Sequence, residues 1–198
     1  MSVIRAFIAV NITPEVEKLL ENILRGLQRD LKGVPVRWVP VKNIHITLKF
    51  LGDVSESNLD ILKKIISVEA AAHSAFEINV SGLGAFPSIK RPRVIWVGVQ
   101  APPELTALQR GIDHETARLG YPGEDRPFSP HLTVGRVSRN ANTNDLQRIN
   151  SALMDVKPGS VQGAKVEAVF LYQSDLQPSG AVYNALYSAN LPERKLPI

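Results

Sequence analysis

The chain has 198 residues, of which 44% are hydrophobic and 21% are charged, a balance that suits one globular unit with a buried core and argues against a disordered chain. It contains no cysteine, which excludes disulfides, thiolate zinc sites and a cysteine nucleophile together. The formal net charge of +4 is compatible with a phosphate-bearing ligand and equally with a slightly basic soluble protein. No apolar run has the length of a membrane span or a signal peptide, so we expect a cytoplasmic protein.

The first half of the chain alternates apolar, β-branched runs with helical patterns. Thr13-Pro14-Glu15 has the composition of a helix start, with a capping residue, a first-turn proline and a favourable acid. The apolar positions from Val16 to Leu27 recur at helical spacing and predict the clearest amphipathic helix of the protein. In chain order we predict a strand at 3–12, this helix, strands at 36–39 and 43–51, a helix capped by Ser55 that lasts to about His73, and a strand at 76–86.

The second half shows a similar order of elements. Pro102-Pro103-Glu104 starts another helix with apolar positions at helical spacing. In chain order we predict a loop at 87–92, a strand at 93–99, this helix, a polar loop at 120–130, a strand at 131–137, a helix capped by Thr143, and strands at 161–172 and 181–191 joined by a turn at 178–180.

The two halves are related by an approximate internal repeat. Glu15 corresponds to Glu104 with an offset of 89 residues, and His45 corresponds to His131 with an offset of 86 residues. Such similar offsets indicate two related halves rather than two stray motifs. We therefore expect an α+β protein with two pseudo-symmetric lobes, each an antiparallel sheet with helices outside, around a central cleft. Residues 1–198 would form this single bilobal domain.

The repeat carries one short motif in each half, His45-Ile46-Thr47-Leu48 and His131-Leu132-Thr133-Val134. Side chains alternate between the two faces of a strand, so we expect His45, Thr47 and Lys49 on one face. Ile44, Ile46, Leu48 and Phe50 would then point into a core. His131 and Thr133 would share a face in the second copy, and a two-fold relation between the lobes would turn both faces into one cleft.

These residue types suit proton transfer at a phosphate. Histidine has an unperturbed pKa of about 6.5, so it can donate or accept a proton near neutrality. A threonine hydroxyl can donate a hydrogen bond to a phosphate oxygen. One histidine followed by threonine is more often an ordinary strand residue, but two such pairs in related halves favour function. A zinc site would need a third ligand, and no HExxH motif is present, so we expect chemistry without metal.

Other polar and aromatic candidates are weaker. We expect His73 and His114 to lie on the surface without a role. A group of cationic residues has two possible interpretations, a basic rim that binds an RNA backbone or an ordinary solvated surface. The group consists of Lys90, Arg91, Arg93, Arg126, Arg136 and Arg139. Three aromatic residues could stack on a base, although the two tryptophans lie in strand-like runs that are more often core: Trp38, Trp96 and Phe128.

The motifs together resemble the two-histidine phosphoesterase superfamily, and within it the RNA 2′,3′-cyclic phosphodiesterases, also called 2′-5′ RNA ligases. The resemblance covers nearly the whole chain, apart from residues 193–198. The segments that carry it are Arg5–Ala9, Asn43–Gly52, Gly82–Pro87, Arg91–Trp96, Ser129–Arg136 and Leu171–Ser174.

The resemblance implies that the protein opens a 2′,3′-cyclic phosphate to a 2′-phosphate with neither metal nor cofactor. It places the proton donor on His45, the proton acceptor on His131, and phosphate contacts on Thr47, Thr133 and Arg136. Strand alternation puts Arg136 on the face opposite His131, so its role requires a bend near Gly135.

The expected partner is RNA with cyclic phosphate ends, tRNA fragments included, and no membrane; we expect a monomer. The same cleft could instead join 2′-5′ linked ends or only bind RNA ends. A non-catalytic scaffold is a third alternative, against which both histidines and both threonines argue.

Overall fold

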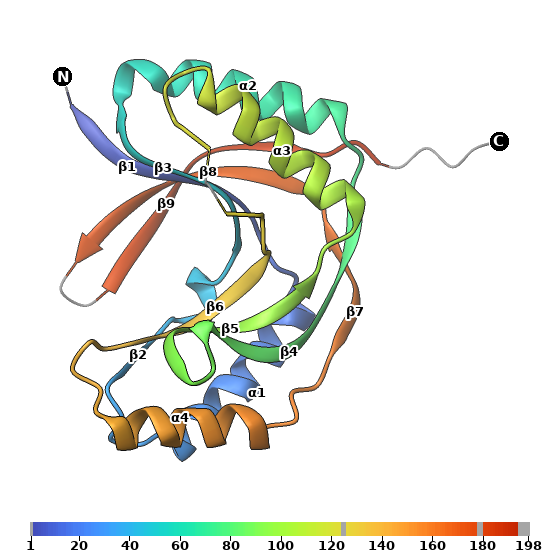
Figure 1. The fold of residues 1–198 in the computed structure, drawn as a ribbon. Helices are drawn as coiled ribbons and strands as arrows, with labels where there is room; N and C mark the ends of the chain where they lie inside the picture. The colour runs from blue at the N-terminus through green and yellow to red at the C-terminus, as the bar shows by residue number, and fades with distance from the viewer. Residues whose placement is uncertain (1, 124–125, 178–179, 194–198) are drawn as a thin grey trace.

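The computed structural model describes residues 2–123, 126–177 and 180–193, which form two antiparallel sheets with helices on their outer faces (Figure 1). The first sheet has the strand order β3 (Ile46–Ser55), β1 (Val3–Val10), β8 (Ala168–Gln177) and β9 (Gly180–Asn190). The second sheet has the order β2 (Val36–Trp38), β6 (His131–Val137), β5 (Arg91–Gln100), β4 (Phe76–Ser88) and β7 (Val161–Val166). The predicted class, α+β with two antiparallel sheets, is confirmed.

Two helices cover each sheet. Helices α2 (Leu59–Ala72) and α3 (Pro103–Ala117) lie side by side over the first sheet, at the top of Figure 1. Helices α1 (Pro14–Asp30) and α4 (Thr143–Asp155) lie over the second sheet, at the bottom. Single 3-10 turns, η1 (Val41–Asn43) and η2 (Glu56–Asn58), precede β3 and α2. Within the described ranges, no helix has both the length and the apolar character needed to cross a membrane.

The two sheets are not the two halves of the sequence. The first half contributes β1 and β3 to the first sheet, but its last strand, β4, lies in the second sheet between β5 and β7. In the same way β8, from the second half, pairs with β1. Each lobe therefore contains strands from both halves of the sequence.

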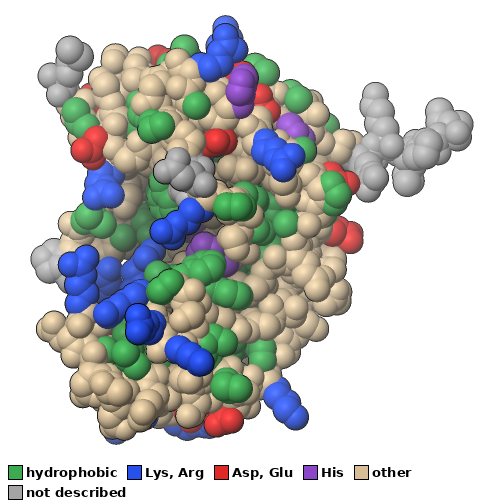
Figure 2. Space-filling view, viewed as in Figure 1, with side chains coloured by type: hydrophobic (Ala, Val, Ile, Leu, Met, Phe, Trp, Pro, Cys, Tyr) green, Lys and Arg blue, Asp and Glu red, His purple; other side chains and the backbone are tan. Residues whose placement is uncertain are grey.

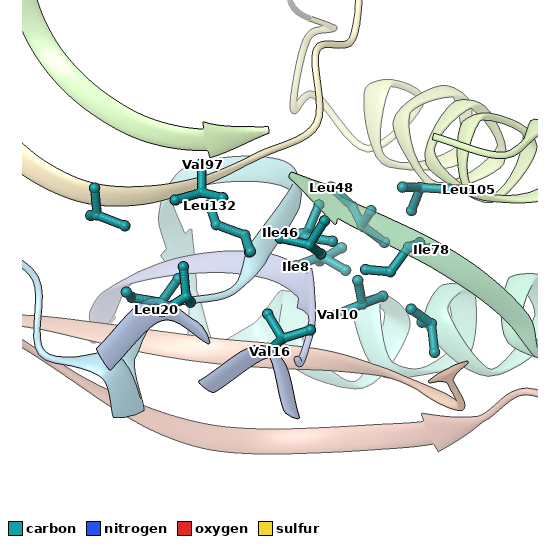
Figure 3. Packing of buried hydrophobic residues seen from close by; sticks show 14 of the residues in the cluster. Ile8, Val10, Val16, Leu20, Ile46, Leu48, Ile78, Val97, Leu105 and Leu132 are labelled. Atoms are coloured by element: carbon teal, nitrogen blue, oxygen red, sulfur yellow. The ribbon is translucent and has the colours of Figure 1, made fainter. Parts of the chain in front are cut away.

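A single cluster of buried apolar side chains extends through both lobes. Figure 3 shows part of it, with Ile8 and Ile46 from the first sheet, Val97 and Leu132 from the second, and Leu20 from α1. All five are fully buried. Burying one such side chain contributes about 1.5–3 kcal/mol, so the shared core fixes how the two sheets face each other.

Several predicted boundaries were wrong. The predicted loop at 87–92 is reduced to a turn at 89–90, because β4 continues to Ser88 and β5 begins at Arg91. The run 161–172 is divided between β7 and β8, which lie in different sheets.

Two predicted caps were also wrong. The cap of α4 is Asn142 rather than Thr143, because the Asn142 side chain accepts from the Asp145 amide. Ser55 precedes η2, and Asn58 takes the position before α2. Residues 178–179 of the predicted turn and residues 194–198 lie outside the described residues.

Candidate active site

Both motif histidines are oriented by the same hydrogen bond. His45 Nδ1 lies 2.9 Å from the carbonyl oxygen of Asn43, and His131 Nδ1 lies 2.7 Å from that of Ser129. A carbonyl oxygen only accepts, so Nδ1 must carry the hydrogen in each ring. The neutral form of each histidine therefore keeps the lone pair on Nε2, which is free to take or give a proton.

Aromatic side chains hold the His45 ring from the side of the first sheet. The ring stacks on Phe7 with centroids 4.6 Å apart and planes 21° apart. The Tyr183 ring meets it edge-on at 5.3 Å. Asn43 Nδ2 also donates to the Ala181 carbonyl at 2.9 Å, which ties the turn before His45 to β9. The position of this imidazole is thus fixed from β1, β9 and its own backbone.

His131 has a corresponding support on the second sheet. The Phe86 ring meets it edge-on with centroids 5.0 Å apart, and the Trp96 ring lies at 6.5 Å. The indole of Trp96 covers Gly84, where a Cβ would come within 2.3 Å of its ring atoms. Glycine at this position therefore lets the tryptophan lie across β4 and form the wall beside His131.

A β-bulge in each motif strand changes which side chains face the cleft. Thr47 pairs with Ala9 and Lys49 with Ile8, so Leu48 is the extra residue on β3. Thr133 pairs with Trp96 and Gly135 with Ile95, which leaves one extra residue at the same place on β6. An extra residue reverses the alternation beyond it. The residue five positions after each histidine therefore shares the histidine's face.

The bulge in β3 makes two predictions wrong. Lys49 does not share the face of His45, because its side chain is buried and forms an ion pair of 2.5 Å with Asp113 of α3. Its ammonium also donates to the Pro122 carbonyl at 2.6 Å. Phe50 does not point into the core; it is 58% exposed and pairs with Phe7, the residue on which His45 stacks.

The bulge in β6 supplies the bend that Arg136 needs. Arg136 is exposed, and the extra residue before Gly135 returns it to the face of His131 and Thr133. Thr47 and Thr133 each lie two residues after the motif histidine, just before the bulge, and both are half-buried. The five residues predicted for the site, His45, His131, Thr47, Thr133 and Arg136, thus lie on the inner faces of the two motif strands.

Burial lowers the pKa of His45 to about 4. The hydrogen bond to the Asn43 carbonyl acts in the opposite direction, whereas the positive charges of Arg136 and His131 lower this pKa further. Charges on the second sheet thus act on an imidazole that is carried by the first sheet. At neutral pH the His45 ring of the free protein is therefore uncharged.

The inner faces line a visible hollow. Figure 2 shows that this face of the molecule is hollowed between the lobes, with a histidine in the hollow and Lys and Arg side chains along its lower edge. Among the described residues, no three His, Asp or Glu side chains gather closely enough to hold a metal ion.

The remaining candidates are not brought into this group. His73 ends α2 and contacts the Glu69 carbonyl, and the exposed His114 pairs with Glu115. Trp38 and Phe128 pack against the core. Arg93 donates to the Ser138 carbonyl at 3.0 Å. The other predicted basic residues are exposed: Lys90, Arg91, Arg126 and Arg139.

Comparison with protein families matches the chain twice to one model, described as LigT like Phosphoesterase, over residues 10–96 and again over 97–183. The internal repeat is thereby confirmed. An RNA 2′,3′-cyclic phosphodiesterase of Methanothermobacter thermautotrophicus is 37% identical over 182 residues, or 91% of this chain and 95% of that protein. One of Archaeoglobus fulgidus is 36% identical over 184 residues, or 92% and 97%.

Solved structures show the same fold. The crystal structure of TT0787 of Thermus thermophilus is 26% identical with a TM-score of 0.77, over 96% of this chain and 100% of that one. The structure of E. coli LigT complexed with 3′-AMP is 26% identical with a TM-score of 0.72, over 96% and 99% of the two chains.

Proposed function

The chain belongs to the LigT like Phosphoesterase family, and we propose that it hydrolyses 2′,3′-cyclic phosphate ends of RNA to 2′-phosphates. The observation that carries the proposal is the pair of histidines on facing strands, each with Nδ1 bound to a backbone carbonyl and Nε2 left for the ligand. The names of the similar proteins support the same activity.

The reaction requires one acid and one base on opposite sides of phosphorus. His131, neutral, takes a proton from the attacking water through Nε2. His45, protonated, gives its proton to the 3′ oxygen as the bond from phosphorus to that oxygen breaks. Two separate rigid strands suit this arrangement because each imidazole has its own fixed direction. The cycle ends when solvent returns a proton to His45 and takes one from His131.

The phosphate is held by the side chains between and beyond the histidines. Thr47 and Thr133 can donate hydrogen bonds to its non-bridging oxygens, and Arg136 adds a charge-assisted contact. The negative charge that they hold also acts on His45. Its pKa is about 4 in the free protein, and an anion beside the ring favours the charged imidazolium. We propose that substrate binding itself raises this pKa and so loads the acid.

The same cleft can serve a second reaction. A 5′-hydroxyl of another RNA in the place of water would give a 2′-5′ linkage with the same proton donor and acceptor. Ligation and end binding are distinguished from hydrolysis by turnover of a cyclic-phosphate RNA in dilute solution, where water is the only abundant nucleophile. We also propose a monomer, with tRNA fragments among its substrates; sedimentation and a cleaved-tRNA substrate test these points.

The direct test is hydrolysis of a 2′,3′-cyclic nucleotide in excess chelator. We expect full activity, because the proposed groups are two imidazoles, two hydroxyls and a guanidinium. His114→Asn is the matched control for His45→Asn and His131→Asn, since His114 is 73% exposed and lies outside the cleft. Loss of activity in chelator that zinc or manganese restores would contradict the proposal, as would normal turnover of a folded His45 or His131 variant.

A further inference from the structure

The edge of the second sheet places two arginines directly opposite each other. Arg37 of β2 pairs in register with Arg136 of β6. Residues opposite each other in an antiparallel pair project from the same face. Arg37 therefore lies on the cleft face beside Arg136, although no sequence motif marks it.

The neighbours of Arg37 confirm this direction. A Cβ on Gly135 would lie 3.0 Å from Val36 Cγ1 and 3.0 Å from Trp38 Cε3. The side chains before and after Arg37 are therefore turned toward the side to which Gly135 would direct a side chain, and both pack against the core. Since side chains alternate along a strand, Arg37 points to the opposite face, where it is exposed.

Two like charges in this arrangement are unfavourable without a counter-charge. Cross-strand pairs of like charge destabilise a sheet, and within the described part of the chain neither guanidinium takes part in an ion pair. A charged residue on an edge strand can also prevent pairing with other chains, but that role does not require a second arginine opposite. An anion between or above the two would relieve the repulsion.

The position of β2 indicates where an anion bound by Arg37 would lie relative to the two histidines. In the described structure, β2 lies next to β6 at one edge of the second sheet, and β3 lies at one edge of the first sheet. Arg37 is thus one strand farther from the histidines, at a strand separation of about 4.8 Å.

Resting on the proposed function, we infer that Arg37 binds the next phosphodiester of the RNA strand while Arg136 holds the cyclic phosphate. The RNA then leaves the cleft over β2. A mononucleotide lacks this second phosphate, so Arg37 makes the enzyme prefer oligonucleotides. Charge-assisted contacts to phosphate are among the stronger hydrogen bonds of proteins, and the site is built from two strands of one sheet.

The test compares kcat/KM for a 2′,3′-cyclic mononucleotide and for a tetranucleotide with the same end. We expect Arg37→Gln to lower the ratio of tetranucleotide to mononucleotide kcat/KM by about tenfold. It should also lower the slope of log affinity against log salt for the tetranucleotide by about 0.7. Arg37→Lys should keep that slope. Arg110→Gln, which removes an exposed arginine from α3, is the control and should leave both quantities unchanged.

An unchanged ratio in Arg37→Gln would overturn the inference, whether both substrates lose activity equally or neither does. Failure of the proposed function gives a different result, because the unaltered protein would then hydrolyse neither substrate. In that event, anisotropy with a labelled tetranucleotide carrying a terminal 2′-phosphate still decides the matter. Equal affinity for the unaltered protein and Arg37→Gln would overturn the second phosphate contact.

Discussion

The depressed pKa of His45 makes the stability of the protein depend on pH in a defined window. The folded-state pKa is about 4, whereas a histidine in the unfolded chain has a pKa of about 6.5. Above both values the ring is neutral in both states and contributes no pH dependence. Between them the unfolded chain binds a proton that the folded cleft rejects, so the free energy of unfolding falls as the pH falls.

The magnitude follows from the difference between the two values. One pKa unit corresponds to about 1.4 kcal/mol, so the shift to about 4 predicts a loss of about 3 kcal/mol from this residue between pH about 6.5 and about 4. Urea unfolding of the unaltered protein and of His45→Gln, measured across this range, isolates the contribution, because the carboxylates titrate in both. The difference in unfolding free energy between the two should change by about this amount.

His114→Gln provides the matched control, since it removes a histidine whose side chain is 73% exposed and lies outside the cleft. The same pH dependence in the unaltered protein and in His45→Gln would refute the reasoning from burial and neighbouring charge. Added inorganic phosphate should raise the pKa of His45, and its affinity should increase tenfold in acid for each unit of that rise. The histidine ring signals in NMR report the pKa directly.

Further outcomes follow for catalysis. His45→Ala and His131→Ala should each lower turnover by about 10²–10⁴-fold. The double variant should be little worse than the poorer single variant, because the two histidines act as a unit. Additive losses in initial-rate assays would contradict the pairing of the two histidines. The pH profile of kcat/KM should be bell-shaped, with one limb set by His45 at about 4 because kcat/KM reports the free enzyme. Arg136→Ala should weaken the binding of a non-hydrolysed phosphate analogue by about 1.5–3 kcal/mol, measured calorimetrically; unaltered affinity would remove Arg136 from the site.

The local signals in the sequence predicted most of the elements and the two motifs. The strand at 131–137 and the helix that starts after Thr13 appear where apolar spacing and the capping residues place them. The repeat of histidine and threonine was visible because each pair lies within three residues. These features depend on residues that are close together in the sequence, so they can be recognised from a single sequence.

The features that the sequence did not reveal depend on pairing between distant strands. The bulges beside Leu48 and before Gly135 exist relative to β1 and β5, so alternation alone misplaced Lys49 and Phe50. Gly135 was the one hint, because glycine in a strand often marks a bulge. The exchange of β4 and β8 between the lobes and the pairing of Arg37 with Arg136 are likewise properties of sheet order.

The position of the broken bond tests the central claim most directly. With His45 as the acid at the 3′ oxygen and His131 as the base on the other side of phosphorus, hydrolysis of a 2′,3′-cyclic nucleotide must leave the phosphate on the 2′ oxygen. Phosphorus NMR of the reaction in excess chelator distinguishes the two isomers. We predict the 2′-phosphate as the predominant product; a predominant 3′-phosphate would contradict the assignment of the two histidines even if both proved essential.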